Sequence, residues 1–217
     1  MPGHDIIVIG ASAGGVEAVS TLVRTLPPKL PAAVFVVLHI PAQGPSLLPE
    51  ILSRYGSLDA VHPTDGEEIK PGRIYVAPPD HHLLVVRDKV RLVHGPKENR
   101  HRPAIDPLFR SAAQAYSRRV VGVVLTGSLD DGTAGLLAIK RRGGIAIVQD
   151  PNEAVYPSMP LNALQNVEVD CTLSLLEIAA VLVRLASEQV QEEEDNSVSE
   201  EMEKETRIVE MDPALVS

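Results

Sequence analysis

Short, continuous apolar runs alternate with longer amphipathic stretches along most of this chain. The apolar runs are rich in Val and Ile and lack polar alternation, which is typical of strands buried on both faces of a parallel sheet. We expect strands over residues 5–9, 33–38, 73–77, 120–125 and 145–149. The alternation with amphipathic segments predicts an α/β fold: a doubly wound, mainly parallel sheet with helices on both faces.

Helix signals occupy most of the intervals between these runs. We expect helices over residues 16–26, from residue 106, over 132–142 and over 174–186. Asp106-Pro107 places a capping side chain before a proline at the first helical position. Ser174 and Glu177 have the spacing of a capping box, so the last helix should begin there and end near residue 186.

One segment departs from the alternation. Two short β-like runs, 83–86 and 90–93, are separated by Arg87, Asp88 and Lys89. This spacing predicts an antiparallel hairpin. Because antiparallel pairs are common at the edge of a parallel sheet, we expect the hairpin to be appended there without changing the fold class.

Charge divides the chain into a body and a tail. The formal net charge of −9 lies entirely in residues 187–217, and residues 1–186 are neutral. A segment this acidic and poor in apolar residues does not bury enough surface to fold alone. We therefore expect one globular domain over residues 1–186 and an acidic, disordered tail over 187–217. The overall acidity also argues against nucleic acid as a partner.

The length of the apolar segments bears on where in the cell the protein is expected. None approaches the ~20 residues that a membrane-spanning helix needs. The N-terminus passes from Met1 to Asp5 directly into a strand, without the pattern of a secretory signal. These features predict a cytoplasmic protein with no membrane insertion. Cys171 is the only cysteine, which excludes an intramolecular disulfide.

The first strand leads into the segment Gly10-Ala11-Ser12-Ala13-Gly14-Gly15. The glycines allow a tight strand-to-helix turn that presents the Ser12 hydroxyl, as a nucleophile requires. A phosphate-binding loop of a dinucleotide fold begins in the same way. However, such a domain usually has Asp or Glu near position 39, where this chain has His39, and Ser12 replaces its middle glycine.

A serine nucleophile needs a base and a group that orients the base. His39 directly follows the second predicted strand, and Asp130 and Asp131 follow the strand over 120–125. Because the carboxyl ends of neighbouring parallel strands meet in one crevice, we expect Ser12 and His39 to lie close together. Either aspartate could orient the histidine, whereas the other, preferably Asp130, would cap the helix from 132.

The chain resembles the catalytic domain of the chemotaxis protein-glutamate methylesterases of the CheB type. The resemblance covers nearly all of residues 1–186. Its motifs are the serine turn 10–15, the histidine segment Leu38-His39-Ile40-Pro41 and the aspartate segment 125–132. Further similarity lies in 72–78, Asn99-Arg100-His101-Arg102-Pro103, 106–113 and 156–160.

This resemblance implies roles for particular residues. Ser12 would be the nucleophile, His39 the general base and then acid, and Asp131 rather than Asp130 the orienting carboxylate. Ala13, Gly14 and Ser128 are the candidate oxyanion and substrate-binding residues, and backbone N–H groups at the start of the first helix are the expected oxyanion donors.

The resemblance also implies a reaction and partners. The reaction would be hydrolysis of glutamate γ-methyl esters on helical, cytoplasmic segments of chemoreceptors, with deamidation of receptor glutamines as a second activity. It would need no metal and no cofactor. A separate receiver protein or a methyltransferase would be a further partner.

Two departures from the family pattern keep a third hypothesis open. Relatives with a receiver domain usually have methionine and glycine where this chain has Ser128 and Leu129. The chain also opens on the first strand of the catalytic domain, so we expect no preceding receiver domain. Both features would suit a catalytically weak module that binds a receptor or another partner.

Overall fold

The strand β1 (Ile6–Ala11) lies at the centre of a seven-stranded sheet in the computed structural model, which describes residues 3–190. The strand order is β3-β4-β2-β1-β7-β8-β9, and every pair is parallel. The remaining strands of the sheet are β2 (Ala33–Leu38), β3 (Asp59–Val61), β4 (Arg73–Val76), β7 (Val120–Val124), β8 (Ile145–Gln149) and β9 (Cys171–Leu173). The parallel sheet confirms the predicted fold class.

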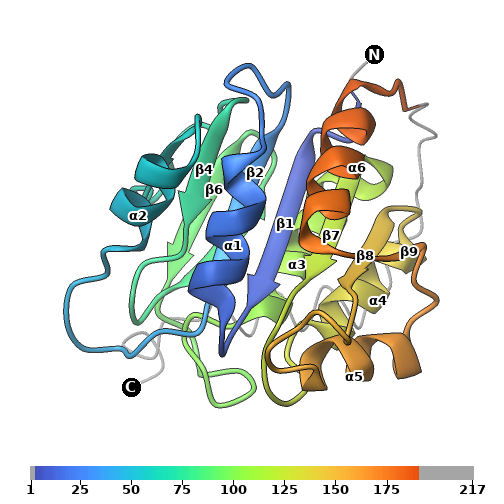
Figure 1. Ribbon diagram of the computed structural model, residues 1–217. Coiled ribbons are helices and arrows are strands. Elements are labelled where there is room, and N and C mark those ends of the chain that lie inside the picture. The colour runs from blue at the N-terminus through green and yellow to red at the C-terminus, as the bar shows by residue number, and fades with distance from the viewer. Residues whose placement is uncertain (1–2, 191–217) are drawn as a thin grey trace.

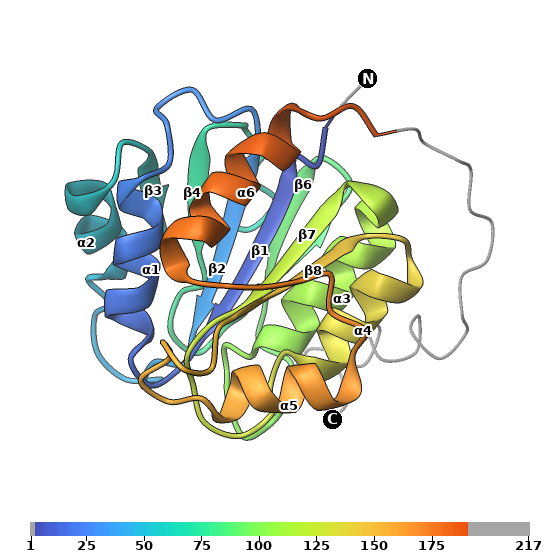
Figure 2. The same cartoon turned by 45° about the vertical axis from the view of Figure 1, so that its right-hand side comes forward.

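Helices cover both faces of the sheet (Figures 1 and 2). One face carries α1 (Gly15–Arg24), α2 (Leu48–Tyr55) and α6 (Leu175–Ser187). The other carries α3 (Ile105–Tyr116), α4 (Thr133–Arg141) and α5 (Ser158–Asn166), and a short 3-10 turn, η1 (Ser117–Arg119), follows α3. Successive β1 side chains point to opposite layers: Ile7 and Ile9 pack in the first, Ile6 and Val8 in the second.

The hairpin is present, but it does not lie at an edge of the main sheet. The strands β5 (His82–Val86) and β6 (Lys89–Val93) form a separate two-stranded antiparallel sheet. The Val85 N–H donates to Ser111 Oγ on α3 (3.0 Å). Leu83, Val85 and Val90 of the hairpin pack in the same apolar cluster as side chains of α3. The hairpin therefore lies against α3 and not along an edge strand, so the predicted edge position was wrong.

The last helix begins as predicted. Ser174 Oγ accepts from the Glu177 N–H (3.5 Å), and the Glu177 carboxylate accepts from the Ser174 N–H (2.9 Å), which confirms the capping box. The helix ends at Ser187, one residue beyond the expected end. Most of the predicted acidic tail, residues 191–217, lies outside the described residues. No helix within residues 3–190 has the length and apolar character to cross a membrane.

His82, on the hairpin, is a buried histidine with both ring nitrogens occupied. Its Nε2 donates to the Pro96 carbonyl (2.9 Å), and its Nδ1 accepts from the Ala104 N–H (3.3 Å). Only a neutral ring offers one donor and one acceptor. Burial lowers the pKa of His82 below the ordinary value of 6.5. The folded protein therefore holds this side chain neutral.

This buried ring predicts a pH-dependent loss of stability. In the unfolded chain His82 binds a proton near its ordinary pKa of 6.5, whereas in the folded protein it resists protonation. Stability should therefore fall as the pH drops below about 6.5. Urea unfolding at about pH 7.5 and about pH 5.5 measures this effect, and His82→Gln should lose less stability across that interval than the wild type. An identical loss in both proteins would contradict the assignment.

Candidate active site

Three loops converge at the carboxyl ends of β1, β2 and β7. The strand β1 pairs with β2 on one side and with β7 on the other, so the segments that follow these strands are neighbours. The chain runs from β1 out to one edge of the sheet and then returns to β7 on the other side of β1. Ligands bind at such a reversal in open α/β sheets. In Figure 1 this end of the sheet is the lower one, where the arrowhead of β1 lies.

Ser12 stands in a tight turn between β1 and α1. Its N–H donates to the Thr126 carbonyl after β7 (3.0 Å), and its own carbonyl accepts from the Gly15 N–H (2.9 Å). Gly14 caps α1 with φ +74°, a left-handed conformation that residues with a Cβ avoid. These constraints fix the Ser12 hydroxyl at the start of the helix.

The His39 ring lies between Ser12 and Asp131. Its Nδ1 is 3.1 Å from Ser12 Oγ, and its Nε2 is 2.7 Å from Asp131 Oδ2. An ionised carboxylate only accepts hydrogen bonds, so Nε2 carries the proton and Nδ1 offers a lone pair to the serine. The side chains of His39 and Asp131 are 5% and 2% exposed, so the pair is shielded from water. The expected proximity of Ser12 and His39 is therefore observed.

The two ring nitrogens have exchanged the places they hold in the familiar Ser-His-Asp arrangement. There, Nδ1 faces the carboxylate and Nε2 faces the serine. Here Nε2 faces Asp131 and Nδ1 faces Ser12. The chemical requirement is still met, because one nitrogen is protonated by its carboxylate partner and the other is free to accept a proton.

Asp131 is held by four donors. Oδ2 accepts from His39 and from the Ile105 N–H (2.8 Å), while Oδ1 accepts from Asn99 Nδ2 (2.7 Å) and the Asp106 N–H (3.1 Å). Burial by itself would raise the pKa of Asp131, but the donated hydrogen bonds and the charge of His39 outweigh it and lower that pKa. Asp131 is therefore an ionised, fixed carboxylate.

The helix caps at this site differ from the predicted ones. Asp106 does not cap its own helix, because the α3 cap is Ala104 and Asp131 accepts the first N–H groups of α3 from outside. The side chain of Asp106 instead accepts from the N–H groups of Gly132 and Gly135 at the start of α4. The prediction that Asp130 caps α4 is therefore wrong. Each of two neighbouring helices is capped by an aspartate from the other segment.

Two further residues lie against the proposed catalytic groups. The His101 ring stacks on the His39 ring with centroids 3.7 Å apart and planes 6° apart. Burial, and then the charge of His39, lower the pKa of His101. Asn99 reaches Asp131 from the same turn. Asn99 and His101 lie in a segment of family similarity that implies a role for neither, and their spacing in the sequence carries no signal of one.

Backbone N–H groups beside Ser12 remain available to a ligand. Among the described residues, those of Ala13, Gly14 and Ser128 donate no hydrogen bond. Gly127 brings the second loop close, since a Cβ there would lie 2.9 Å from Ser12 Cβ and would overlap Met159 Sδ. A side chain at position 127 would therefore push the Ser128 loop away from the serine.

Leu129 is strained. Its φ is +68°, in the left-handed region, and its side chain is 54% exposed. The loop is held in place because the Leu129 carbonyl accepts from Asn162 Nδ2 (2.8 Å) and Ser158 Oγ (3.3 Å) on α5. A conformation that is unfavourable for a leucine persists where its surroundings fix it in this way.

Leu129→Gly should therefore stabilise the fold. A side chain in the left-handed region costs about 1–2 kcal/mol, and the greater freedom of an unfolded glycine offsets about 0.5–1 kcal/mol of that gain. We expect urea unfolding to show a net stabilisation of about 0.5–1 kcal/mol. Leu129→Ala is the matched control, because it keeps the Cβ and hence the strain. Equal stability of the two variants would contradict the assignment.

Comparisons with known proteins agree with this arrangement. The model of the CheB methylesterase family matches residues 7–182. A Leptospira interrogans protein, provisionally named as a protein-glutamate methylesterase/protein-glutamine glutaminase, is 41% identical over 84% of this chain and 95% of its own length. The protein of that name from Chromohalobacter salexigens is 38% identical over 83% of this chain, which spans only 52% of that relative.

A solved structure shows the same fold. The Thermotoga maritima CheB methylesterase catalytic domain superposes with a TM-score of 0.78 at 34% identity, covering 83% of this chain and 98% of that domain. A dinucleotide-binding domain was suggested by the glycine turn alone, and the family match replaces that alternative. The chain belongs to the CheB methylesterase family.

Proposed function

We propose that this protein is a protein-glutamate methylesterase that uses Ser12 as nucleophile, His39 as general base and acid, and Asp131 as the orienting carboxylate. Its substrates would be glutamate γ-methyl esters on chemoreceptor-like proteins, and its products glutamate and methanol. The observation that carries this proposal is the His39 ring, which contacts Ser12 Oγ and Asp131 Oδ2 through different nitrogens. Relatives bearing the methylesterase name support the substrate class.

The reaction would proceed in two acyl-transfer steps. Ser12 Oγ attacks the ester carbonyl carbon while its proton passes to His39 Nδ1. The bond to the methoxy oxygen then breaks, and the leaving methoxide takes this proton and departs as methanol. Water, deprotonated by the same nitrogen, then attacks the acyl carbon. The bond from that carbon to Ser12 Oγ breaks, Oγ takes the proton back from His39 Nδ1, and the glutamate side chain is released. The charge of Asp131 stabilises the imidazolium in each step.

Charge on the carbonyl oxygen also needs donors. The N–H groups of Ala13, Gly14 and Ser128 are suitable, because they flank Ser12 and donate to no other group among the described residues. One oxyanion donor is worth about 3–4 kcal/mol in comparable hydrolases. Since backbone groups act here, the side chain at position 128 does not need to be methionine.

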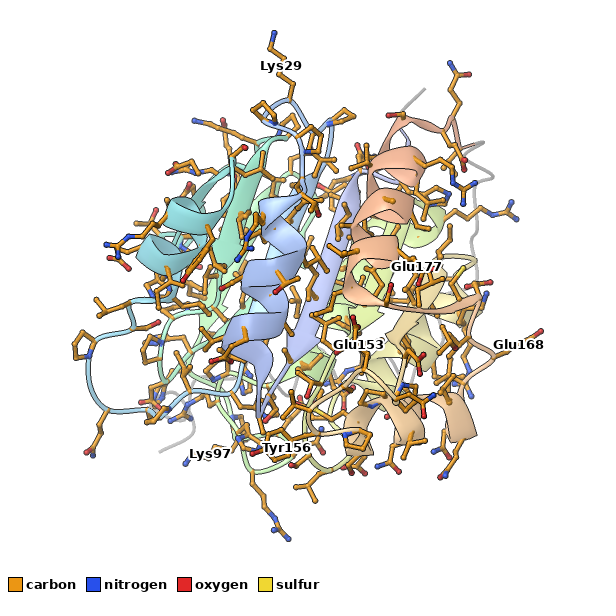
Figure 3. All side chains as sticks on the ribbon, viewed as in Figure 1. Lys29, Lys97, Glu153, Tyr156, Glu168 and Glu177 are labelled. Atoms are coloured by element: carbon orange, nitrogen blue, oxygen red, sulfur yellow. The ribbon has the colours of Figure 1, made fainter. Side chains whose placement is uncertain are left out.

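The surroundings of the serine favour a protein substrate. Exposed apolar side chains lie on the loops beside it: Leu129, Val155 and Tyr156. Figure 3 shows Tyr156 and Lys97 at the end of the molecule where β1 finishes, and Lys29 at the opposite end. A receptor helix with apolar and acidic side chains would fit such a surface. Deamidation of receptor glutamines would follow the same route, with ammonia in place of methanol.

The alternative is a binding module without turnover. It was suggested by Ser128 and Leu129, but the contacts of His39 with Ser12 and Asp131 support turnover by a serine hydrolase. We therefore favour the enzyme. A separate receiver protein or a methyltransferase as partner stays a proposal that rests on the family resemblance.

The test is methanol release from a methylated receptor cytoplasmic fragment. We expect the wild type to release methanol from the methylated fragment and none from the same fragment with unmethylated glutamates. A third arm, with glutamine at the same positions, measures ammonia and decides on deamidation separately. Binding of the methylated fragment without methanol release would favour the binding module and contradict the proposed function.

A further inference from the structure

We propose that Asn99 and Asp106 are positioning residues, which fix the Asp131 carboxylate so that it holds His39 in register with Ser12. The inference rests on the proposed function, because it assigns Asp131 its role in the same site. Neither residue contacts Ser12 or His39 through a hydrogen bond among the described residues. Each acts through Asp131.

The amide of Asn99 bridges two buried carboxylates. Its Nδ2 is 2.7 Å from Asp131 Oδ1 and 2.8 Å from Asp106 Oδ2. A side-chain amide nitrogen carries two hydrogens, so both are used. The amide therefore determines the position of Asp131 relative to Asp106, and a group with one donor would satisfy only one of them.

The turn that carries Asn99 is itself fixed. Glu98 and His101 exchange two backbone hydrogen bonds of 3.2 and 2.8 Å, which closes the turn. Both carboxylate oxygens of Glu98 accept from Arg110 Nη2 on α3 (2.7 and 2.8 Å). Asn99 has φ +47°, which asparagine tolerates better than most residues. The same turn stacks the His101 ring on the His39 ring, so it contacts the site through both Asn99 and His101.

Asp106 constrains Asp131 by a second route. Its Oδ1 accepts from the Gly132 N–H (3.0 Å) and the Gly135 N–H (2.6 Å). Gly132 is the residue after Asp131. Its hydrogen bond to Asp106 therefore fixes the backbone next to Asp131, in addition to the bonds that fix the Asp131 carboxylate. Positive partial charge at the start of α4 favours an acidic group here.

The bridge needs an acceptor at position 106. Burial and the nearby charge of Asp131 raise the pKa of Asp106, while Arg110 and the hydrogen bonds from Gly135 and Asn99 oppose that rise. In Asp106→Asn, the new amide keeps its oxygen for the N–H groups of α4 and turns its nitrogen toward Asn99. Two amide nitrogens would then face each other, and the hydrogen bond from Asn99 Nδ2 to Asp131 Oδ1 would be weakened or lost.

The first test compares Asn99→Ala with Asp106→Asn in methanol release from the methylated receptor fragment. Misplacing a catalytic group by about 1 Å costs about 100-fold, so we expect kcat to fall about 10- to 100-fold with KM within about twofold. Asn166→Ala and Asp59→Asn are the matched controls. Both lie at exposed positions, on α5 and β3, and should keep the wild-type kcat. Wild-type kcat in folded Asn99→Ala overturns the proposal.

Dependence on Asp131 separates positioning from a general structural role. In an Asp131→Asn background, Asn99→Ala should lower kcat by less than about twofold, because the group it positions is already disabled. A purely structural residue would lower kcat by the same factor in both backgrounds, and that result overturns the proposal. Asn99→Ala also keeps the α4 cap, so it remains informative if Asp106→Asn fails to fold.

Proton NMR can test the position of Asp131 without measuring turnover. The His39 Nε2 proton, hydrogen-bonded to Asp131, should give a low-field proton NMR signal that His39→Ala removes. We expect Asn99→Ala to shift this signal or lose it to exchange with water, and an unchanged signal overturns the proposal. If the wild type releases no methanol, the proposed function fails, whereas this signal still decides whether Asn99 positions Asp131.

Discussion

Ser12→Ala should abolish methanol release, lowering kcat by about 10⁴-fold or more. Among residues 3–190, the Ser12 hydroxyl is the nucleophilic group that His39 Nδ1 contacts, at 3.1 Å. Alanine leaves the backbone of the turn intact, because the bonds from Ser12 N–H to Thr126 and from Gly15 N–H to the Ser12 carbonyl involve no side-chain atom. The variant should therefore fold and still bind the methylated receptor fragment.

The measurement is the initial rate of methanol release, together with the thermal midpoint of each protein. Ser187→Ala is the matched control, since that hydroxyl donates to the Val183 carbonyl at the far end of α6. It should turn over as the wild type does. A folded Ser12→Ala protein with a substantial rate would mean that another group attacks the ester.

Asp131→Asn should lower kcat by about 10⁴-fold. An asparagine that presents its nitrogen to His39 Nε2 reverses the ring tautomer, so Nδ1 becomes protonated and no longer accepts the proton of Ser12. The substitution also places an amide N–H₂ group against a buried N–H donor, because both carboxylate oxygens of Asp131 accept backbone N–H groups of α3. We expect a loss of about 1–3 kcal/mol of stability as well.

Asp130→Asn is a close control for this variant. Asp130 is the neighbouring residue, it is exposed, and its carbonyl rather than its side chain accepts from the Thr133 N–H. The rate of methanol release should be nearly unchanged in Asp130→Asn and nearly absent in Asp131→Asn. Similar losses in both variants would indicate a diffuse effect of charge at this loop and count against the orienting role of Asp131.

Much of the fold is readable from the apolar runs. The predicted strands 33–38 and 145–149 coincide with β2 and β8, because strands buried on both faces of a parallel sheet are continuous apolar runs. The parallel pairing of β1 with β2 is also what brings Ser12 and His39 together. Side chains that follow neighbouring strands are therefore predictable as partners.

Short elements were missed. The strands β3 and β9 have three residues each, too few to produce a periodic pattern, and they lie at the edges of the sheet. The helix α5 contains Pro160 and several polar residues, which hide its apolar face. The hairpin was identified, but its place against α3 depends on a tertiary contact that alternation does not encode.

The buried hydrogen bonds that hold Asp131 in place could not be predicted from the sequence either. Asp106 looked like the cap of its own helix, since it stands before a proline, yet its side chain caps α4 from α3. Asn99 lies 32 residues from Asp131 in the chain, and nothing in the local pattern pairs them. Contacts of this kind depend on how two helix starts meet in space, which a residue pattern along one segment does not specify.

The central claim is that Ser12 of this protein hydrolyses a glutamate methyl ester. The most direct test is the rate of methanol release from a methylated receptor fragment, with the wild type and Ser12→Ala assayed in parallel at equal concentration. We predict release in proportion to wild-type enzyme and none above the blank with Ser12→Ala. Equal release by both proteins, or no release by the wild type, would contradict the claim.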